Sequence, residues 1–211
     1  GEPTQLKLVT AHKGSLWMRM ETRGKAAHGA TPQFGRNAVH EMARIVDLLE
    51  SSYRATLKRR SHPLLGHATA NIGTIQGGVQ PNIVPSSCVA SLDRRTLPGE
   101  TEASVEKEIK LLLRHHGLRA KISKTRINPC RAMETDPDLP LVRLFAQVIG
   151  QRKPLGVDYY CDASVLSQGG IPSVVFGPGN IVQAHTNDEW ISVRALERGK
   201  NLLVKFLRSL P

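Results

Sequence analysis

Aromatic side chains, cysteines and long apolar runs are all scarce in this chain of 211 residues. Aromatic residues make up only 4% of the chain, which leaves few platforms on which nucleic-acid bases could stack. The three cysteines lie far apart and form no CxxC pair, which argues against a disulfide framework or a cysteine zinc site. No apolar run has the length of a membrane span, and no charged-then-apolar leader opens the chain. We therefore expect a cytoplasmic protein that binds neither membrane nor nucleic acid.

Charge of one sign is in excess, because the chain carries a formal net charge of +11. A basic surface attracts nucleic acid, anionic lipid or small carboxylates. Here the basic residues are scattered, and the densest cluster, residues 58–60, has no interleaved aromatic residue. We interpret the charge as a solvated basic surface. RNA binding is the alternative, and it requires aromatic residues on an exposed sheet face, where Trp17 is the one plausible candidate.

The first 127 residues predict an α+β fold in which elements follow the order β-α-β-β-α-β. Alternating apolar and polar residues predict four strands, at residues 15–23, 68–76, 86–95 and 118–127. Asn37 and Thr101 are predicted to begin two helices, which end near Leu57 and Gly117. The first helix should bury Val39, Met42, Val46 and Leu49. This order is the split pattern of a ferredoxin-like sandwich, in which two helices cover one face of an antiparallel sheet.

Residues 128–211 show a different pattern, in which helices and a strand alternate. Helices are predicted at residues 139–151, from Asp162 onward and at residues 192–210, and the last should direct inward Leu196, Leu203, Phe206 and Leu210. The apolar run 171–176 predicts a buried strand of a parallel sheet. One strand cannot form a sheet alone. We therefore expect the rest of this α/β sheet to precede Gly1, and the chain to be the second part of a longer protein.

Several polar residues are candidates for chemistry. His185 follows the predicted buried strand, where open α/β sheets place ligands, and is either a metal ligand or a surface histidine. His28 lies among small residues that let a ligand approach, or it is a solvent-exposed loop histidine. Asn82 either donates to an oxyanion or makes a turn. Arg95 either binds a substrate carboxylate or forms a surface pair with Asp93.

Five blocks of sequence carry a family resemblance. They are Gly1-Glu2-Pro3-Thr4 with Ala11-His12-Lys13-Gly14, Gly24-Lys25-Ala26-Ala27-His28, Gly77-Gly78 with Asn82, Asp93-Arg94-Arg95 with Pro98-Gly99, and Phe176-Gly177-Pro178-Gly179 with residues 184–189. In order and spacing they resemble the family of acetylornithine deacetylase, succinyl-diaminopimelate desuccinylase, aminoacylase and carboxypeptidase G. The resemblance covers essentially the whole chain, and five blocks in order are a specific signal.

The resemblance implies an organisation into three segments. Residues 1–12 would end an N-terminal catalytic segment, residues 13–127 would form a ferredoxin-like lid that also dimerises, and residues 128–211 would be the C-terminal part of an α/β catalytic domain. Members of the family are dizinc hydrolases, with cobalt as a substitute metal, that cleave the amide bond of an N-acyl amino acid or a peptide. The resemblance therefore implies a homodimer that acts on such a small molecule.

The resemblance also implies roles for single residues. Glu2 and His185 would be ligands of one zinc ion each, while His28 and Asn82 would steady the tetrahedral oxyanion, commonly across the dimer in the partner's site. Substrate contacts would come from Arg95, Gly177, Gly179 and Asp162.

The chain departs from the family pattern in one respect. The family's His-x-Asp pair, bridging aspartate and catalytic Glu-Glu pair do not occur in these residues. We therefore expect the chain by itself to bind no pair of zinc ions tightly and to be inactive. The alternative function is a non-catalytic ferredoxin-like dimerisation or binding module.

Overall fold

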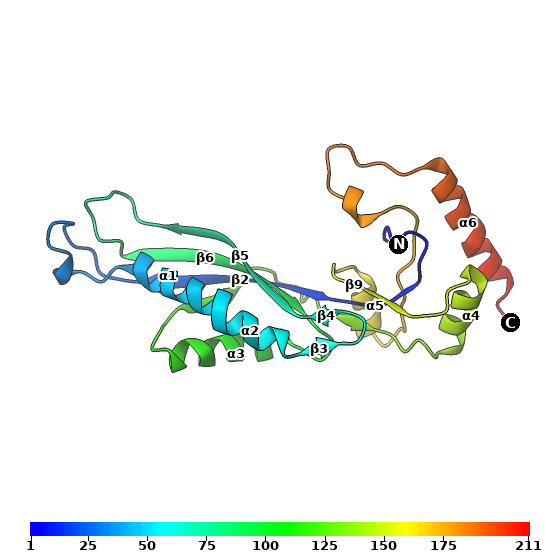
Figure 1. Cartoon of the computed structure of the whole chain (residues 1–211), viewed down its shortest axis with the longest axis horizontal. Coiled ribbons are helices and arrows are strands. Elements are labelled where there is room, and N and C mark those ends of the chain that lie inside the picture. The colour runs from blue at the N-terminus through cyan, green and yellow to red at the C-terminus, as the bar shows by residue number, and fades with distance from the viewer. The chain divides into compact units, whose positions relative to one another are not determined.

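The computed structural model describes all residues from 1 to 211, and the chain divides into two compact units (Figure 1). Unit 1 combines three stretches, Gly1–Lys13, Pro63–Leu65 and Ala132–Pro211. Unit 2 combines the stretches Gly14–His62 and Gly66–Arg131, so it is inserted into unit 1 along the chain. None of the helices is both long and apolar enough to cross a membrane.

Unit 2 is a sandwich of helices on an antiparallel sheet of four strands. The spatial order of the strands is β5 (Thr69–Gly77), β6 (Ser87–Thr96), β2 (Gly14–Arg23) and β7 (Lys121–Lys124). Its helical segments are α1 (Ala38–Leu48), the π-helical turn η2 (Leu49–Tyr53), α2 (Arg54–Lys58) and α3 (Glu102–His115), all on one side of the sheet in Figure 1. The expected order β-α-β-β-α-β and the α+β fold class are confirmed.

Alternating side chains give the sheet one buried and one open face. In β2, Leu16, Met18 and Met20 are at most 4% exposed, whereas Trp17 between them is 43% exposed. Strand β6 repeats the alternation, with the buried residues Cys88, Ala90 and Leu92. The alternation of apolar and polar residues that predicted these two strands therefore corresponds to a buried and an open face. The predicted fourth strand is shorter than expected, because only Lys121–Lys124 pairs with β2.

Both predicted helix starts of unit 2 are confirmed. The Asn37 side chain accepts hydrogen bonds from the first turn of α1, and Thr101 forms a capping box at α3. The predicted buried stripe of α1 is partly wrong. Val39 and Val46 are only half-buried, and the inward positions belong to Ala38, Met42, Ile45, Leu48 and Leu49. The π-helical turn η2 follows directly, and it adds one residue to a helical turn, which shifts the buried face along the chain. The hairpin of β3 (Ser61–His62) and β4 (Gly66–His67) was not predicted from the sequence.

One arginine is fully buried in unit 2. Arg94 is 0% exposed, and its Nε donates a hydrogen bond to Tyr53 Oη at 3.1 Å. Its Nη2 donates to Glu100 Oε1 at 2.6 Å, and its Nη1 donates to the carbonyl oxygen of Arg95. The turn η2 ends at Tyr53, which is itself 1% exposed. Each of the three guanidinium nitrogens thus makes a hydrogen bond, and the bond to Tyr53 joins β6 to the helical layer.

Unit 1 holds a three-stranded sheet in the order β8 (Met133–Glu134), β1 (Val9–His12) and β9 (Leu155–Val157). Strand β1 is parallel to β9 and antiparallel to β8. The helices of this unit are α4 (Pro140–Ile149), α5 (Ala163–Gln168) and α6 (Val193–Arg208). Two short 3₁₀ helices, η1 (Pro32–Phe34) in unit 2 and η3 (Ile181–Gln183) in unit 1, complete the chain.

Two predictions about unit 1 are wrong. Residues 171–176 form no strand, because only Val175 makes an isolated antiparallel bridge, to Val9, and Ile171 is 56% exposed. The sheet is built instead around β1, which the sequence analysis did not identify. In α6, Phe206 stacks on Phe145 at 4.4 Å as expected for an inward residue. The three other predicted inward residues are 38–54% exposed, namely Leu196, Leu203 and Leu210.

Candidate functional site

The first residues of unit 1 are bound to the Gly177-Pro178-Gly179 turn. The backbone N–H groups of Thr4 and Leu6 donate to Gly177 O at 3.1 and 2.9 Å, and Gly177 N donates to Thr4 Oγ1 at 3.1 Å. A side chain at Gly177 would not fit, because its Cβ would lie 2.5 Å from the carbonyl oxygen of Glu2. Glycine at this position therefore allows the backbone around Glu2 to lie directly on the turn.

A cavity of about 620 Å³ in unit 1 opens beside this contact. Glu2, Gly177, Gly179 and Glu189 line it. Its remaining wall is largely apolar and includes Phe176, Trp190, Ile191 and Leu203. The structure thus brings together three residues that the sequence analysis named as site candidates. Glu189 was not among those candidates.

His185 lies on the loop that borders this cavity. Its neighbour Ala184 lines the cavity, and its backbone N–H donates to Glu189 Oε2 at 2.9 Å. The side chain of His185 is exposed, and its φ of 62° lies in the left-handed region. Such a backbone conformation costs a non-glycine residue about 1–3 kcal/mol and is enriched at functional sites. The carboxylate four residues after the histidine was the available sequence signal for Glu189.

The negative charge of Glu2 acts on the hydroxyl group of Tyr159 in the same unit. Burial, and then the negative charge of Glu2, raise the pKa of Tyr159 to about 12. The Tyr159 hydroxyl is buried and has no hydrogen-bond partner. Burial likewise raises the pKa of the Cys161 thiol. Asp162, next along the chain, is exposed and precedes α5 without capping it through its side chain. Tyr159 is therefore a neutral donor near Glu2 that sequence reasoning missed.

The metal-binding capacity of these residues is limited. The carboxylate of Glu2 and the imidazole of His185 are both ligand types that zinc accepts. However, the structure contains no group of three or more His, Cys, Asp or Glu side chains placed to hold a metal ion. The chemistry of the two donors fits zinc, but a zinc site needs more ligands than they supply.

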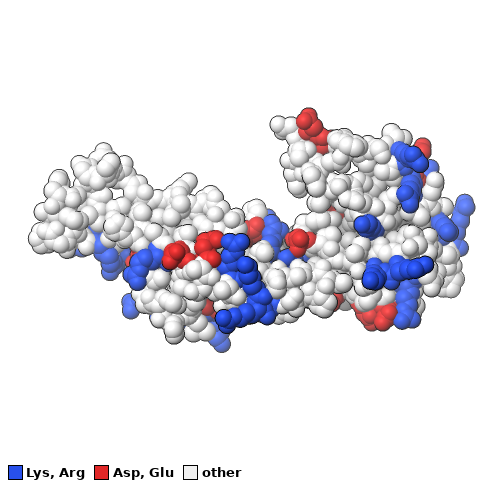
Figure 2. Space-filling view, viewed as in Figure 1, with Lys and Arg blue, Asp and Glu red and all other residues white.

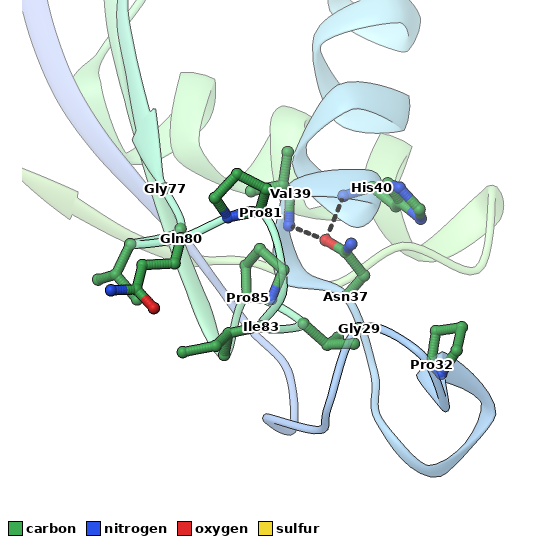
Figure 3. A pocket seen from close by; sticks show the side chains of 13 residues that line it. Gly29, Pro32, Asn37, Val39, His40, Gly77, Gln80, Pro81, Ile83 and Pro85 are labelled. Carbon is green, nitrogen blue, oxygen red and sulfur yellow. Dashed lines mark hydrogen bonds between the residues drawn. The ribbon is translucent and has the colours of Figure 1, made fainter.

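Two loops of unit 2 hold His28 and Asn82 next to each other. Gly29 N donates to Asn82 O at 2.7 Å, and His28 forms an antiparallel bridge with Ile83. Ala30 N donates to His28 Nδ1 at 3.1 Å, so in the neutral ring the proton resides on Nε2, which is free to donate. A hollow of about 570 Å³ lies between the two loops and the start of α1 (Figure 3).

Arg95 lies far from these two loops. It is near the end of β6, whereas the Asn82 loop precedes the start of that strand at Ser87. Eight extended residues span roughly 25 Å, so Arg95 and Asn82 cannot contact one small molecule within a single unit 2. Arg95 Nη2 instead donates to Asp93 Oδ2 at 2.9 Å, the surface pair that the sequence analysis considered.

Replacing Gly177 by alanine is expected to lower the free energy of unfolding by about 1–3 kcal/mol, because the added Cβ would meet Glu2 backbone atoms. Urea denaturation followed by circular dichroism measures the effect. Gly73→Ala is the matched control, since its Cβ would make only an ordinary contact of 3.5 Å. Equal stability of Gly177→Ala and the parent chain would contradict the close contact.

The fold defines the chain as a ferredoxin-like sandwich inserted into an α/β unit. Residues 10–121 match the peptidase dimerisation domain of the M20 family. Acetylornithine deacetylase from Myxococcus xanthus is 31% identical over 214 residues, a match that covers 97% of this chain and 55% of the relative.

Two solved structures share the fold. Aminopeptidase PepT from Bacillus cereus superposes with a TM-score of 0.71 at 25% identity, over 98% of this chain and 54% of that protein. An M20 family metallo-carboxypeptidase from Sulfolobus solfataricus superposes with a TM-score of 0.70 at 17% identity, over 96% of this chain and 59% of that protein.

The chain belongs to the M20 family of zinc peptidases and deacetylases, which is the family its sequence blocks resemble. It spans about half the length of the curated relatives that it matches.

Proposed function

We propose that the chain supplies the lid and the C-terminal part of the catalytic domain of a metal-dependent amidohydrolase. The observation that carries the proposal is the contact that places Glu2 and the Gly177-Pro178-Gly179 turn around one cavity, bordered by the His185 loop. The proposed substrate is an N-acyl amino acid or a peptide. Because all three cysteines are free, we place the protein in the reducing cytoplasm.

The proposed metal site combines donors from this chain with donors from the rest of the enzyme. Glu2 and His185 would each bind one of two zinc ions, or of two cobalt ions in their place. Bound zinc lowers the pKa of water and polarises an amide carbonyl. Glu189 holds the His185 backbone in its left-handed conformation through the hydrogen bond to His185 N. The largely apolar wall of the cavity lies beside Glu2, which is half-buried.

Residues of the lid would act on the oxyanion. His28 Nε2–H and the Asn82 amide are hydrogen-bond donors on two loops that backbone contacts hold together. Since roughly 25 Å of β6 separates Asn82 from Arg95, we assign these residues to two different active sites of a dimer. His28 and Asn82 would serve the partner's site, while Arg95 would leave Asp93 to bind the substrate carboxylate in its own site.

The edge strand β5 is the proposed dimer contact. It pairs only with β6, so its other edge is unpaired. Edge strands are usually protected by charged residues or proline, but β5 has the sequence TANIGTIQG and contains neither. Ile75 on this strand is 50% exposed. An unprotected edge with an exposed apolar residue favours pairing with a second copy of the strand.

Ile75→Lys is expected to weaken dimerisation at least tenfold, because a charge would be placed in the proposed interface. Sedimentation equilibrium over a range of concentrations measures the dissociation constant. Leu111→Lys is the matched control, since Leu111 is 53% exposed but lies on α3. A parent chain that remains monomeric at high concentration would rule out the interface.

The activity proposal is tested with two proteins, this chain and the product of the complete reading frame that contains it. In calorimetric titration with zinc, the chain is expected to show no pair of tight sites and to hydrolyse no acyl amino acid. The complete product is expected to bind two zinc ions and to hydrolyse acetylornithine, succinyl-diaminopimelate or another acyl amino acid or peptide. Two tight sites in the chain itself, or an inactive, zinc-free complete product, would overturn the proposal.

A non-catalytic dimerisation module is the second candidate. The match of residues 10–121 to a peptidase dimerisation domain favours it. The same experiment distinguishes the two candidates. A dimerisation module would dimerise both as this chain and as the complete product, but neither protein would hydrolyse a substrate.

A further inference from the structure

Unit 2 has a second hollow, of about 680 Å³, at the start of α1. The turn between α3 and β7 forms one wall, and the end of β2 and the first turns of α1 form the others. Because β7 and β5 are opposite edges of the sheet, this hollow lies away from the β5 edge. The proposed oxyanion residues His28 and Asn82 do not line it.

The hollow is lined by an excess of positive charge. Five exposed cationic side chains contribute to it, namely Arg23, Arg36, Arg44, Arg119 and Lys121. Elsewhere in unit 2 several cations have acidic partners, as Arg60 does with Glu108 and Lys124 with Glu102. In the hollow, the side chains of Arg44, Arg119 and Lys121 make no hydrogen bond or ion pair in the structure. Figure 2 shows that basic residues form separate patches on the helical side of unit 2.

The two carboxylates in the hollow are already engaged. Glu21 binds Arg19 at 2.7 Å and Arg23 at 2.9 Å, and the bond to Arg19 helps to lower the pKa of Glu21. Glu41 accepts a hydrogen bond from the backbone N–H of Arg119 at 3.2 Å. Neither carboxylate forms an ion pair with Arg44, Arg119 or Lys121, so the charge of Glu41 offsets only part of the positive charge of the hollow.

The position at a helix start adds to the positive potential. The hollow includes Asn37 and His40, which belong to the cap and first turn of the 11-residue helix α1. The aligned peptide dipoles of a helix place a partial positive charge at this end. Apart from His40, the lining contains no aromatic ring, so it offers no platform on which a nucleotide base could stack.

We propose that this hollow binds a compact phosphate-type anion with two or more negative charges. Arginine side chains suit such a ligand because their planar forks donate two hydrogen bonds to one phosphate group. Arg44 lies on α1 and Arg119 on the α3–β7 turn, two segments joined by the hydrogen bond from Arg119 N to Glu41, so that one ligand in the hollow would contact both arginines. The site is independent of the proposed hydrolase function.

Calorimetric titration of the chain with inorganic pyrophosphate, at a fixed physiological ionic strength, tests the proposal. The parent chain is expected to bind one equivalent, and the double variant Arg44→Ala/Arg119→Ala to bind at least tenfold more weakly. Arg59→Ala/Arg131→Ala is the control, because it removes two exposed arginines of unit 2 from outside the hollow. All four residues are exposed, so both variants are expected to keep the circular dichroism spectrum of the parent.

Three outcomes would overturn the proposal. The parent could show no saturable binding, or the two double variants could lose affinity equally, which would indicate attraction by overall charge alone. In a further arm, vesicles with anionic lipid could bind the chain in a way that pyrophosphate does not displace, which would indicate a membrane-facing surface in place of a small-ligand site. Loss of pyrophosphate binding in Arg44→Ala/Arg119→Ala, but not in the control variant, supports the proposal.

Discussion

Replacing His185 by alanine in the complete enzyme is expected to lower kcat/KM by roughly a thousandfold or more, since a bound metal contributes several kcal/mol to catalysis. Zinc content should fall with activity, because the imidazole would be one of the few protein ligands of its ion. Metal analysis of the purified variant and a hydrolysis assay on acyl amino acids measure the two effects. Glu2→Gln should show the same paired loss, since an amide is a weak zinc ligand.

His115→Ala is the matched control for this experiment. It also removes one exposed imidazole, but from the end of α3, outside every residue set assigned to the site. Its activity and zinc content should equal those of the parent enzyme. If His185→Ala kept both zinc ions and its activity, the loop that borders the Glu2 cavity would have no role in metal binding, and the amidohydrolase proposal would fail.

Arg94→Ala is expected to destabilise the chain by about 3–5 kcal/mol, because it leaves Glu100 without its buried partner and opens a cavity beside Tyr53. Arg94→Met should cost less, since methionine fills most of the volume and only the charged contacts are lost. The free energy of unfolding from urea denaturation, monitored by far-UV circular dichroism, measures both effects.

Arg59→Ala is the control for the stability experiment, because Arg59 is exposed and its removal should change the free energy of unfolding by no more than about 0.5 kcal/mol. A similarly small change for Arg94→Ala would mean that Arg60, which lies 3.5 Å from Glu100 Oε1, or water replaces the lost partner. In that case the buried network would not be what joins β6 to the helices.

Local patterns in the sequence were sufficient to predict most of the helices and strands of unit 2. Alternation in β2 and β6 defines a face, and the caps at Asn37 and Thr101 define helix starts, because both features depend on residues close together in the chain. The π-helical turn at residues 49–53 could not be predicted in this way. Tyr53, at the end of this turn, contacts Arg94, which lies 41 residues further along and is not part of any local pattern.

Unit 1 was predicted less well, because its sheet is built from short segments that are distant in sequence. Strand β1 has four residues, and it pairs with β8 and β9, which lie more than 100 residues later. Four residues show too little periodicity to identify a strand. The run 171–176 has the composition of a buried strand, yet its backbone pairs with β1 only at Val175.

The sequence by itself determined the family, the fold class and the candidate residues Glu2, His28, Asn82 and His185, because ordered motifs and residue types are properties of the chain. Only the tertiary structure decided which of them are neighbours. It places Glu2 on the Gly177 turn and His28 beside Asn82, and it keeps Arg95 roughly 25 Å of strand away from Asn82. The physical reason is that backbone hydrogen bonds between distant segments set these distances, and no local pattern encodes such bonds.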